Sequence, residues 1–314
     1  MHNIFSLFDN YLYDFKKYLS YSSAIYPPQK LAQLEAKITA RYHNIEKGLS
    51  LANIKLGFGK EKIEILFSFL DQYVNSGFDQ ERQTFQIALS VLDSYVKYHE
   101  KNDFEVNWIK GKLKQYSNLS KNEGGTVTCS KNEIIEKEKL NFESLALNRH
   151  SIRNFSKEAV SEKDILKAIK IAQKSPSVCN RQSGRVHVVR NEKLKSKVLE
   201  LHKGNAGFGD SANLLLIVSS DLRTFTSVGE RNQGYIDGSL FGMTLTYALH
   251  SLGLATCIMN WSVEKDDDKK LHLMVGIPDQ EVVVFLIAVG QYPDKFEVAK
   301  STRKDIKEVV KLID

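Results

Sequence analysis

The sequence lacks the features that would place a protein in a membrane or direct it out of the cell. Its longest apolar run, residues 282–289, is too short to span a bilayer and fits a buried strand. The N-terminus shows no basic segment followed by an apolar one, because Asp9 and Asp14 soon interrupt it, so no secretory signal is evident. These absences predict a cytoplasmic protein.

Cysteine is scarce. The three cysteines, Cys129, Cys179 and Cys257, are widely spaced and form no Cys-x-x-Cys pair, which favours reduced thiols over a disulfide framework. Cys179 is open to two interpretations, a small buried apolar side chain or a nucleophile. The second would require a neighbouring base that the sequence does not show.

Charge of one sign does not dominate either. The net charge is +6, from 44 Lys and Arg against 38 Asp and Glu, and lysines alternate with glutamates, as in residues 60–64. This pattern is typical of solvated helix faces rather than of a nucleic-acid surface. With 42% hydrophobic and 26% charged residues, the composition predicts a soluble globular protein with no nucleic-acid or membrane partner.

The chain contains two successive regions that differ in their pattern of apolar residues. Apolar residues recur at helical spacing through the first ~120 residues, and a polar stretch without such periodicity begins at residue 117. We therefore predict an all-α domain over residues 1–120, a linker over 121–140 and a second domain over 141–314. The periodic positions include Leu34, Ile38, Ile45, Ile63, Leu66, Leu70, Phe85, Leu89 and Leu92.

The second region mixes helices and strands. Residues 161–164 have the pattern of a capping box at a helix start, and residues 236–252 form a long apolar helix pattern that ends at Gly253, a natural C-cap. Short, largely apolar runs at 186–189, 214–218 and 282–289 predict strands.

Two polar segments in this region suggest a nucleotide-like cofactor. Residues 149–153, Arg-His-Ser-Ile-Arg, bring together two guanidiniums, an imidazole and a hydroxyl, which suit a phosphate ester. Residues 175–182 supply a rigid turn followed by Asn180 and Gln182, whose carboxamides can recognise the edge of a planar heterocycle. The alternative interpretations are a solvated segment and an ordinary turn.

With two further segments, the second region resembles the FMN-dependent nitroreductase family. Residues 252–261 are similar to the family's segment beneath the flavin ring, and residues 289–293, followed by 301–304, are similar to its closing strand and phosphate-binding Arg. The resemblance spans about residues 141–314. It implies an α+β fold, with a mainly antiparallel sheet flanked by helices, in an intertwined homodimer whose two FMN sites are lined by both subunits.

The resemblance also implies an activity. Family members typically oxidise NAD(P)H with bound FMN and pass the electrons to a small organic acceptor in a ping-pong scheme, so no side chain is nominated as an obligatory acid or base. The sequence has no Rossmann fingerprint and does not choose NADH over NADPH. The implied cofactor-binding residues are Arg149, His150, Ser151, Arg153, Pro176, Ser177, Asn180, Gln182, Asn260, Trp261 and Arg303.

Several of these residues have plainer alternatives. Arg303 could be a surface charge, Trp261 a core or interface aromatic, and His150 a local structural hydrogen-bond partner. His43 and Glu46 share a helix face with Lys47, but two potential ligands do not make a metal site, so an ion-pair cluster or a domain-contact face is expected there and no metal.

The sequence departs from the family pattern at two places. Ser183 and Gly184 stand where the family commonly has Pro-Trp, so we expect a lower wall and a wider mouth that admits larger or tethered substrates. Gly209 and Asp210 are the nearest equivalents of an Asn that reads the flavin in many members.

The helical region is not part of the usual nitroreductase. Residues 42–49 resemble a helical extension of some bacterial members, sometimes encoded near polysaccharide-synthesis genes. We hypothesise that residues 1–120 shape or cap the mouth. The alternatives are a specialised flavin dehydrogenase acting on a metabolite or carrier-bound substrate, including a polysaccharide-related one, and an interaction protein, flavin-binding or flavin-free, whose helical domain recruits a partner.

Overall fold

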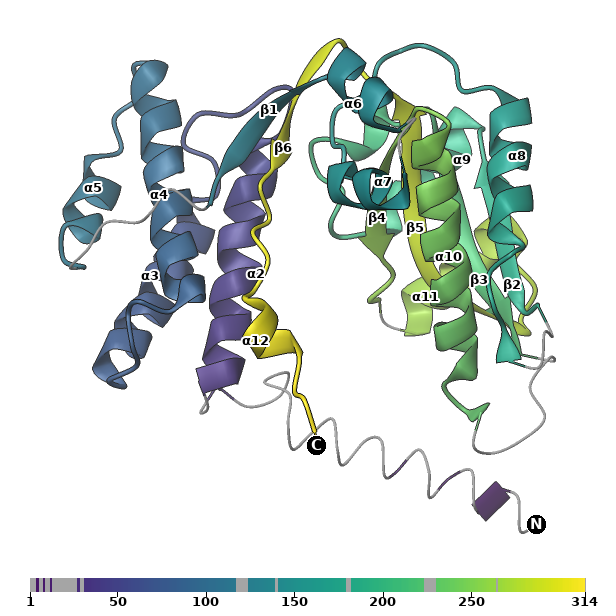
Figure 1. The fold of residues 1–314 in the computed structure, drawn as a ribbon, viewed down its shortest axis with the longest axis horizontal. Helices are drawn as coiled ribbons and strands as arrows, with labels where there is room; N and C mark the ends of the chain where they lie inside the picture. The colour runs from purple at the N-terminus through teal and green to yellow at the C-terminus, as the bar shows by residue number, and fades with distance from the viewer. Residues whose placement is uncertain are drawn as a thin grey trace. The chain divides into compact units, whose positions relative to one another are not determined.

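The computed structural model divides the chain into two compact units (Figure 1). One unit comprises Met1–Tyr11 and Cys129–Phe296, and the other comprises Leu12–Thr128 and Glu297–Asp314. The described residues are 4, 5, 8, 12, 27, 28, 31–116, 124–138, 141–178, 182–222, 230–263 and 265–313.

Among the described residues of the helical unit, four helices meet with their apolar faces in one core. These are α2 (Leu31–Leu49), α3 (Lys60–Asn75), α4 (Gln83–Lys101) and α5 (Asn107–Leu113), with α2 packed against both α3 and α4. The predicted helical spacing is confirmed, because the periodic residues are the ones that the structure buries. They include Leu34, Ile38, Ile45, Ile63, Leu66, Leu70, Phe85, Leu89 and Leu92.

Polar side chains inside this unit are hydrogen-bonded. His99 is fully buried, with Nδ1 at 2.8 Å from the Tyr95 carbonyl and Nε2 accepting the Gly57 N–H at 2.9 Å. Glu46 is likewise buried, and its carboxylate lies 3.2 Å from His43 Nδ1 and accepts the Gly125 N–H at 3.1 Å. Of the two expectations for this face, an ion-pair cluster or a domain-contact face, the contact between His43 and Glu46 fits the first. Among the described residues, no group of three or more His, Cys, Asp or Glu side chains is arranged to hold a metal ion.

The C-terminal segment packs with the helices. Strand β6 (Lys295–Ala299) pairs with β1 (Thr126–Ser130), and the unit boundary falls inside both strands. Beyond them, Glu308 in α12 (Ile306–Val309) lies 3.7 Å from Arg82 Nη2. This division differs from the predicted limits, which grouped residues 297–314 with the sheet.

The second unit contains a four-stranded antiparallel sheet of order β2-β3-β5-β4. Its strands are β2 (Gly184–Val189), β3 (Leu214–Asp221), β4 (Leu254–Asn260) and β5 (Glu281–Gln291). Alternate residues of β3, Leu214, Leu216 and Val218, pack against α8 (Glu162–Ala172) and α10 (Gln233–Ser251). The predicted α+β class with a mainly antiparallel sheet is confirmed.

Further helices complete this unit. They are α6 (Lys131–Glu138), α7 (Phe142–Asn148), α9 (Glu192–Leu201), the 3-10 turn η2 (Gly209–Ser211) and α11 (Lys265–Val275). The α9 helix contacts β3 and α11. Ser161 is the N-cap of α8, as predicted, although its side chain forms no capping bond, and Gly253 follows α10 with φ of 75°. No described helix combines the length and the apolarity that crossing a membrane requires.

Two buried tyrosines make the stability of the helical unit sensitive to alkali. Burial raises the pKa of Tyr95 to about 12, and burial together with the charge of Glu35 raises that of Tyr73 to about 12. A raised folded-state pKa stabilises the fold fully below the ordinary tyrosine pKa of about 10 and loses that contribution as pH rises through 12. We predict that the free energy of unfolding is lower at about pH 11 than at about pH 8, because the loss begins near the ordinary tyrosine pKa of about 10.

Tyr95→Phe should reduce this alkaline loss, because phenylalanine has no proton to release. At neutral pH the variant should be less stable by about 1 kcal/mol, since the Tyr95 hydroxyl donates to the Phe58 carbonyl at 2.7 Å. Urea unfolding at both pH values measures the difference, with the half-exposed Tyr235→Phe as control. An equal alkaline loss in wild type and Tyr95→Phe would contradict the prediction.

Candidate functional site

The Arg-His-Ser-Ile-Arg segment lies beside strand β4. Helix α7 ends at Asn148, Arg149 is its C-cap, and the Ile152 N–H donates to the Thr256 carbonyl at 2.8 Å. The backbone bond therefore fixes the middle of the segment to the edge of the sheet, while Arg149, His150 and Ser151 are half-buried.

Arg153 is the most buried polar side chain of this segment, at 7% exposed. Its guanidinium carbon lies 5.9 Å from the Phe208 ring centroid, and Nη1 donates to the Ser151 carbonyl at 3.4 Å. The Nε atom is buried without a hydrogen-bond partner among the described residues. A buried guanidinium N–H that lacks an acceptor is costly, so this position suits an anionic ligand oxygen.

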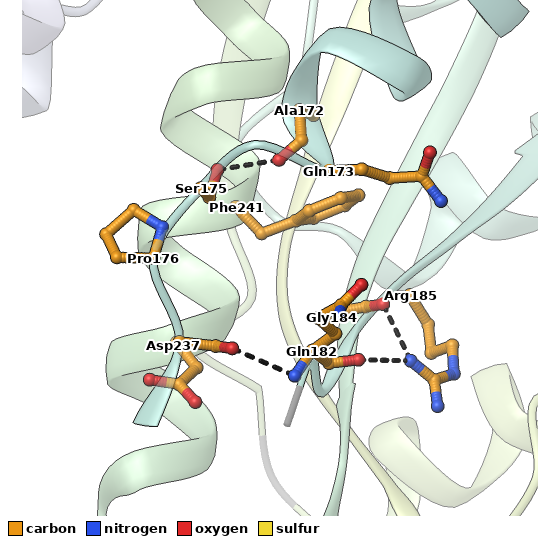
Figure 2. Close-up of a pocket in the computed structure, with 10 residues that line it drawn as sticks. Ala172, Gln173, Ser175, Pro176, Gln182, Gly184, Arg185, Asp237 and Phe241 are labelled. Carbon is orange, nitrogen blue, oxygen red and sulfur yellow. Dashed lines mark hydrogen bonds between the residues drawn. The ribbon is translucent and has the colours of Figure 1, made fainter. Parts of the chain in front are cut away.

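The turn after α8 borders a cavity of about 160 Å³, which Pro176 and Gln182 line (Figure 2). Ser177 lines the same cavity. Ser177 Oγ accepts the Gln182 N–H at 2.9 Å, which closes the turn. Gln182 has φ of 49°, a conformation that a residue with a side chain adopts only when its surroundings enforce it.

Arg185 helps to enforce that conformation. Its Nη1 donates to the Gln182 carbonyl at 2.8 Å and to the Gly184 carbonyl at 2.9 Å, as Figure 2 shows. Its Nη2 lies 3.4 Å from Asp221 Oδ2 at the end of β3. The guanidinium thus holds the end of the turn onto the sheet.

The lower wall expected at Gly184 is not present. A Cβ atom at Gly184 would lie 2.7 Å from Cγ of Phe241, a buried residue of α10 that lines the same cavity. The ring of Phe241 therefore occupies the space beside Gly184, and the expectation of a wider mouth there was wrong. The sequence pattern could not reveal this because Phe241 comes from a helix more than fifty residues away.

We predict that Gly184→Ala destabilises the protein by about 1–3 kcal/mol, through overpacking against Phe241. In a Phe241→Leu background, Gly184→Ala should reduce the free energy of unfolding clearly less, because the smaller side chain leaves room for the new Cβ atom. Denaturant unfolding of wild type, the two single variants and the double variant gives the coupling free energy between the two positions. Gly111→Ala, where the new Cβ meets nothing within 4 Å, is the control and should not destabilise. Strict additivity of the two changes would contradict the packing argument.

Asn260 and Trp261 lie at the end of β4, where they line a groove of about 910 Å³. The Asn260 carbonyl accepts from His202 Nε2 at 2.9 Å. Because the Gly204 N–H donates to Nδ1 of the same ring at 3.2 Å, His202 carries its proton on Nε2. Trp261 Nε1 donates to Asp268 Oδ1 of α11 at 2.7 Å. Both residues are thus fixed at the rim of the groove.

Comparison with known proteins identifies this part of the chain. Residues 146–206 and 197–291 match the model of the nitroreductase family. Residues 146–291 are therefore similar to the nitroreductase family. Over 148 residues the chain is also 28% identical to a protein of Archaeoglobus fulgidus named for an NADH dehydrogenase or NAD(P)H nitroreductase activity. The aligned residues make up 46% of this chain and 81% of that protein.

Solved structures resemble the same part. A nitroreductase family protein of Streptococcus pneumoniae is 22% identical with a TM-score of 0.47, covering 55% of this chain and 100% of that one. An FMN-dependent nitroreductase of Clostridium difficile is 20% identical with a TM-score of 0.40, covering 46% and 83%.

The nitroreductase region holds most of the predicted site residues in three places: the segment beside β4, the turn cavity and the groove. Asn180 lies outside the described residues, as does Cys179. Arg303 lies in the helical unit, where its carbonyl accepts from Gln83 Nε2 at 2.6 Å. The cofactor contacts of all these residues stay predictions.

The sequence analysis missed residues that support the candidate site from a distance. Arg185 and Asp237 form hydrogen bonds to the turn, and Phe241 packs beside Gly184 at the same cavity. His202 and Asp268 form hydrogen bonds to Asn260 and Trp261, respectively. None of them belongs to the four motifs, and each meets its partner only through the fold. The isolated Asp in the apolar run 236–252 was the one available signal.

Proposed function

We propose that the protein is a cytoplasmic, FMN-dependent NAD(P)H oxidoreductase of nitroreductase type that reduces a small organic acceptor. The family match supports an oxidoreductase. The observation that carries the cofactor assignment is the buried Arg153, whose Nε has no hydrogen-bond partner among the described residues and which follows Arg149, His150 and Ser151 beside β4.

The residues present fit FMN in their chemistry. Two guanidiniums and a hydroxyl in the segment 149–153 suit the phosphate. Pro176, Ser177, Asn180 and Gln182 would face the ring and its edge. Backbone N–H groups at 260–261 would donate to the ring. The chemistry that FMN supplies when bound is hydride transfer from NAD(P)H and onward reduction of the acceptor, in a ping-pong order.

The chain's own part in this reaction is to bind and orient the cofactor. Arg153 is held between the Ser151 carbonyl and the Phe208 ring, so its charge is fixed before any ligand arrives. His202 and Asp268 fix the residues at the end of β4, so the donors there would need little reorganisation.

We predict that the purified protein binds one FMN per chain and that Arg153→Ala weakens this binding by one to two orders of magnitude. A charge-assisted hydrogen bond contributes about 1.5–3 kcal/mol, which corresponds to such a factor. Arg153→Lys should recover only part of it, because an ammonium cannot reproduce the guanidinium N–H directions.

Equilibrium titration with FMN, followed by flavin fluorescence, measures the dissociation constants. Arg190→Ala, which removes an exposed cation from the same unit, is the matched control and should bind like wild type. Equal affinity of the Arg153→Ala and Arg190→Ala chains would remove the main support for this site. NADH oxidation with nitroarenes or quinones then tests the activity class.

We also propose a homodimer through α10. The structure buries Phe241, Leu245 and Leu249 within the chain but leaves Ile236 at 49% and Leu240 at 43% exposed, one helical turn apart. An apolar strip of this kind on a central helix favours association.

Ile236→Glu with Leu240→Glu should therefore convert a dimer into a monomer, because two charges would have to be desolvated at the interface. Light scattering measures the mass, and Leu166→Glu, on the exposed side of α8, is the control. A wild-type chain that is monomeric with FMN bound would contradict the proposal.

A further inference from the structure

Asp237 is a buried carboxylate that belongs to none of the motifs. It lies on α10, is 3% exposed and lines the turn cavity (Figure 2). Its Oδ2 accepts the Val178 N–H at 3.1 Å, and its Oδ1 accepts from Gln233 Nε2 at 2.8 Å. One oxygen thus holds the turn, and the other is held by the residue one helical turn earlier.

Both partners of this carboxylate are neutral amides. Burying an ionised carboxylate costs several kcal/mol, and neutral donors offset that cost less completely than a cation does. Aspartate has a low helix propensity, so the stability of the α10 helix does not explain an aspartate at position 237. The bond to Val178, which joins positions 59 residues apart, is the contact that accounts for a carboxylate here.

Among the described residues of the turn, further bonds fix the backbone on either side of Val178. Ser175 Oγ donates to the Ala172 carbonyl at 2.7 Å at the start of the turn. At the other end, Ser177 Oγ accepts from Gln182 and Arg185 donates to the Gln182 carbonyl. The backbone just after Pro176 and Ser177 is tied to α10 through Asp237.

We propose that Asp237 is a positioning residue for the cofactor: it holds the backbone of residues 176–178 in the orientation in which it would meet the flavin ring. This inference rests on the proposed function, because the turn faces a flavin only if FMN binds. Asp237 itself need not touch the cofactor. It acts through the Val178 amide.

Three variants test the inference. Asp237→Ala removes both acceptors, and Asp237→Asn retains one oxygen that can accept the Val178 N–H. Thr246→Ala is the matched control on the same helix: it removes a fully buried hydroxyl, which donates to the Gly242 carbonyl at 2.8 Å, and leaves the turn untouched. Thermal unfolding of each chain measures how much stability is lost.

The first readout is hydrogen exchange at the Val178 amide without FMN. Asp237→Ala should accelerate exchange at least tenfold, the factor expected for loss of one hydrogen bond to a charged acceptor, whereas Asp237→Asn and Thr246→Ala should leave it near wild type. The second readout is FMN affinity. Asp237→Ala should raise the dissociation constant about tenfold, Asp237→Asn should restore most of it, and Thr246→Ala should not change it.

The outcomes distinguish a failure of the proposed function from a failure of the role proposed for Asp237. Wild type that binds no FMN would overturn the proposed function and the cofactor role of Asp237, while the exchange data would still show whether Asp237 holds the turn. Wild type that binds FMN, with Asp237→Ala and Thr246→Ala equal in affinity, would overturn this inference alone. If Asp237→Ala does not fold, Asp237→Leu, which keeps the branching at Cγ but has no acceptor, replaces it and is compared with Asp237→Asn.

Discussion

The close approach of α10 to the four-stranded sheet is the constraint on which the site depends. The helix contacts all four strands, and it can do so because small residues face the sheet. A Cβ atom at Gly238 would lie 2.6 Å from Val284 Cγ2, and one at Gly242 would overlap the ring of Phe285. Since α10 lies this close, Asp237 and Phe241, which neighbour these glycines, reach the turn that follows α8.

The consequences extend to both sides of α10. The ring of Phe241 replaces the bulk that Gly184 lacks, and the Asp237 carboxylate meets the Val178 amide. Leu245 and Leu249 fill the core between α10 and the sheet, which leaves Ile236 and Leu240 on the outer side of the helix. One helix thus packs the core, supports the turn and presents an apolar strip.

Local patterns predicted the elements well, because each pattern reports a local preference. The spacing of Ile63, Leu66 and Leu70 is that of one helix face, and the run 282–289 is β-branched and apolar, as a central strand requires. The grouping of residues 297–314 with the helices was not predictable, because it depends on long-range contacts such as the one between Gln83 and Arg303.

The site was predictable only where its residues are contiguous in sequence. Arg149 to Arg153 and Pro176 to Gln182 stand in short motifs, so their chemistry could be recognised before the fold was known. The supporting residues could not, since His202 meets Asn260 across 58 positions and Arg185 meets Asp221 across 36. Their side chains acquire a role only when the sheet register brings them together.

We propose above all that the buried guanidinium of Arg153 binds the phosphate of FMN. A crystal structure of the protein grown with FMN tests it most directly. The account predicts a phosphate oxygen within about 3 Å of Arg153 Nε, the normal length of such a hydrogen bond. Bound FMN whose phosphate lies elsewhere, with Arg153 Nε still lacking an acceptor, would contradict it.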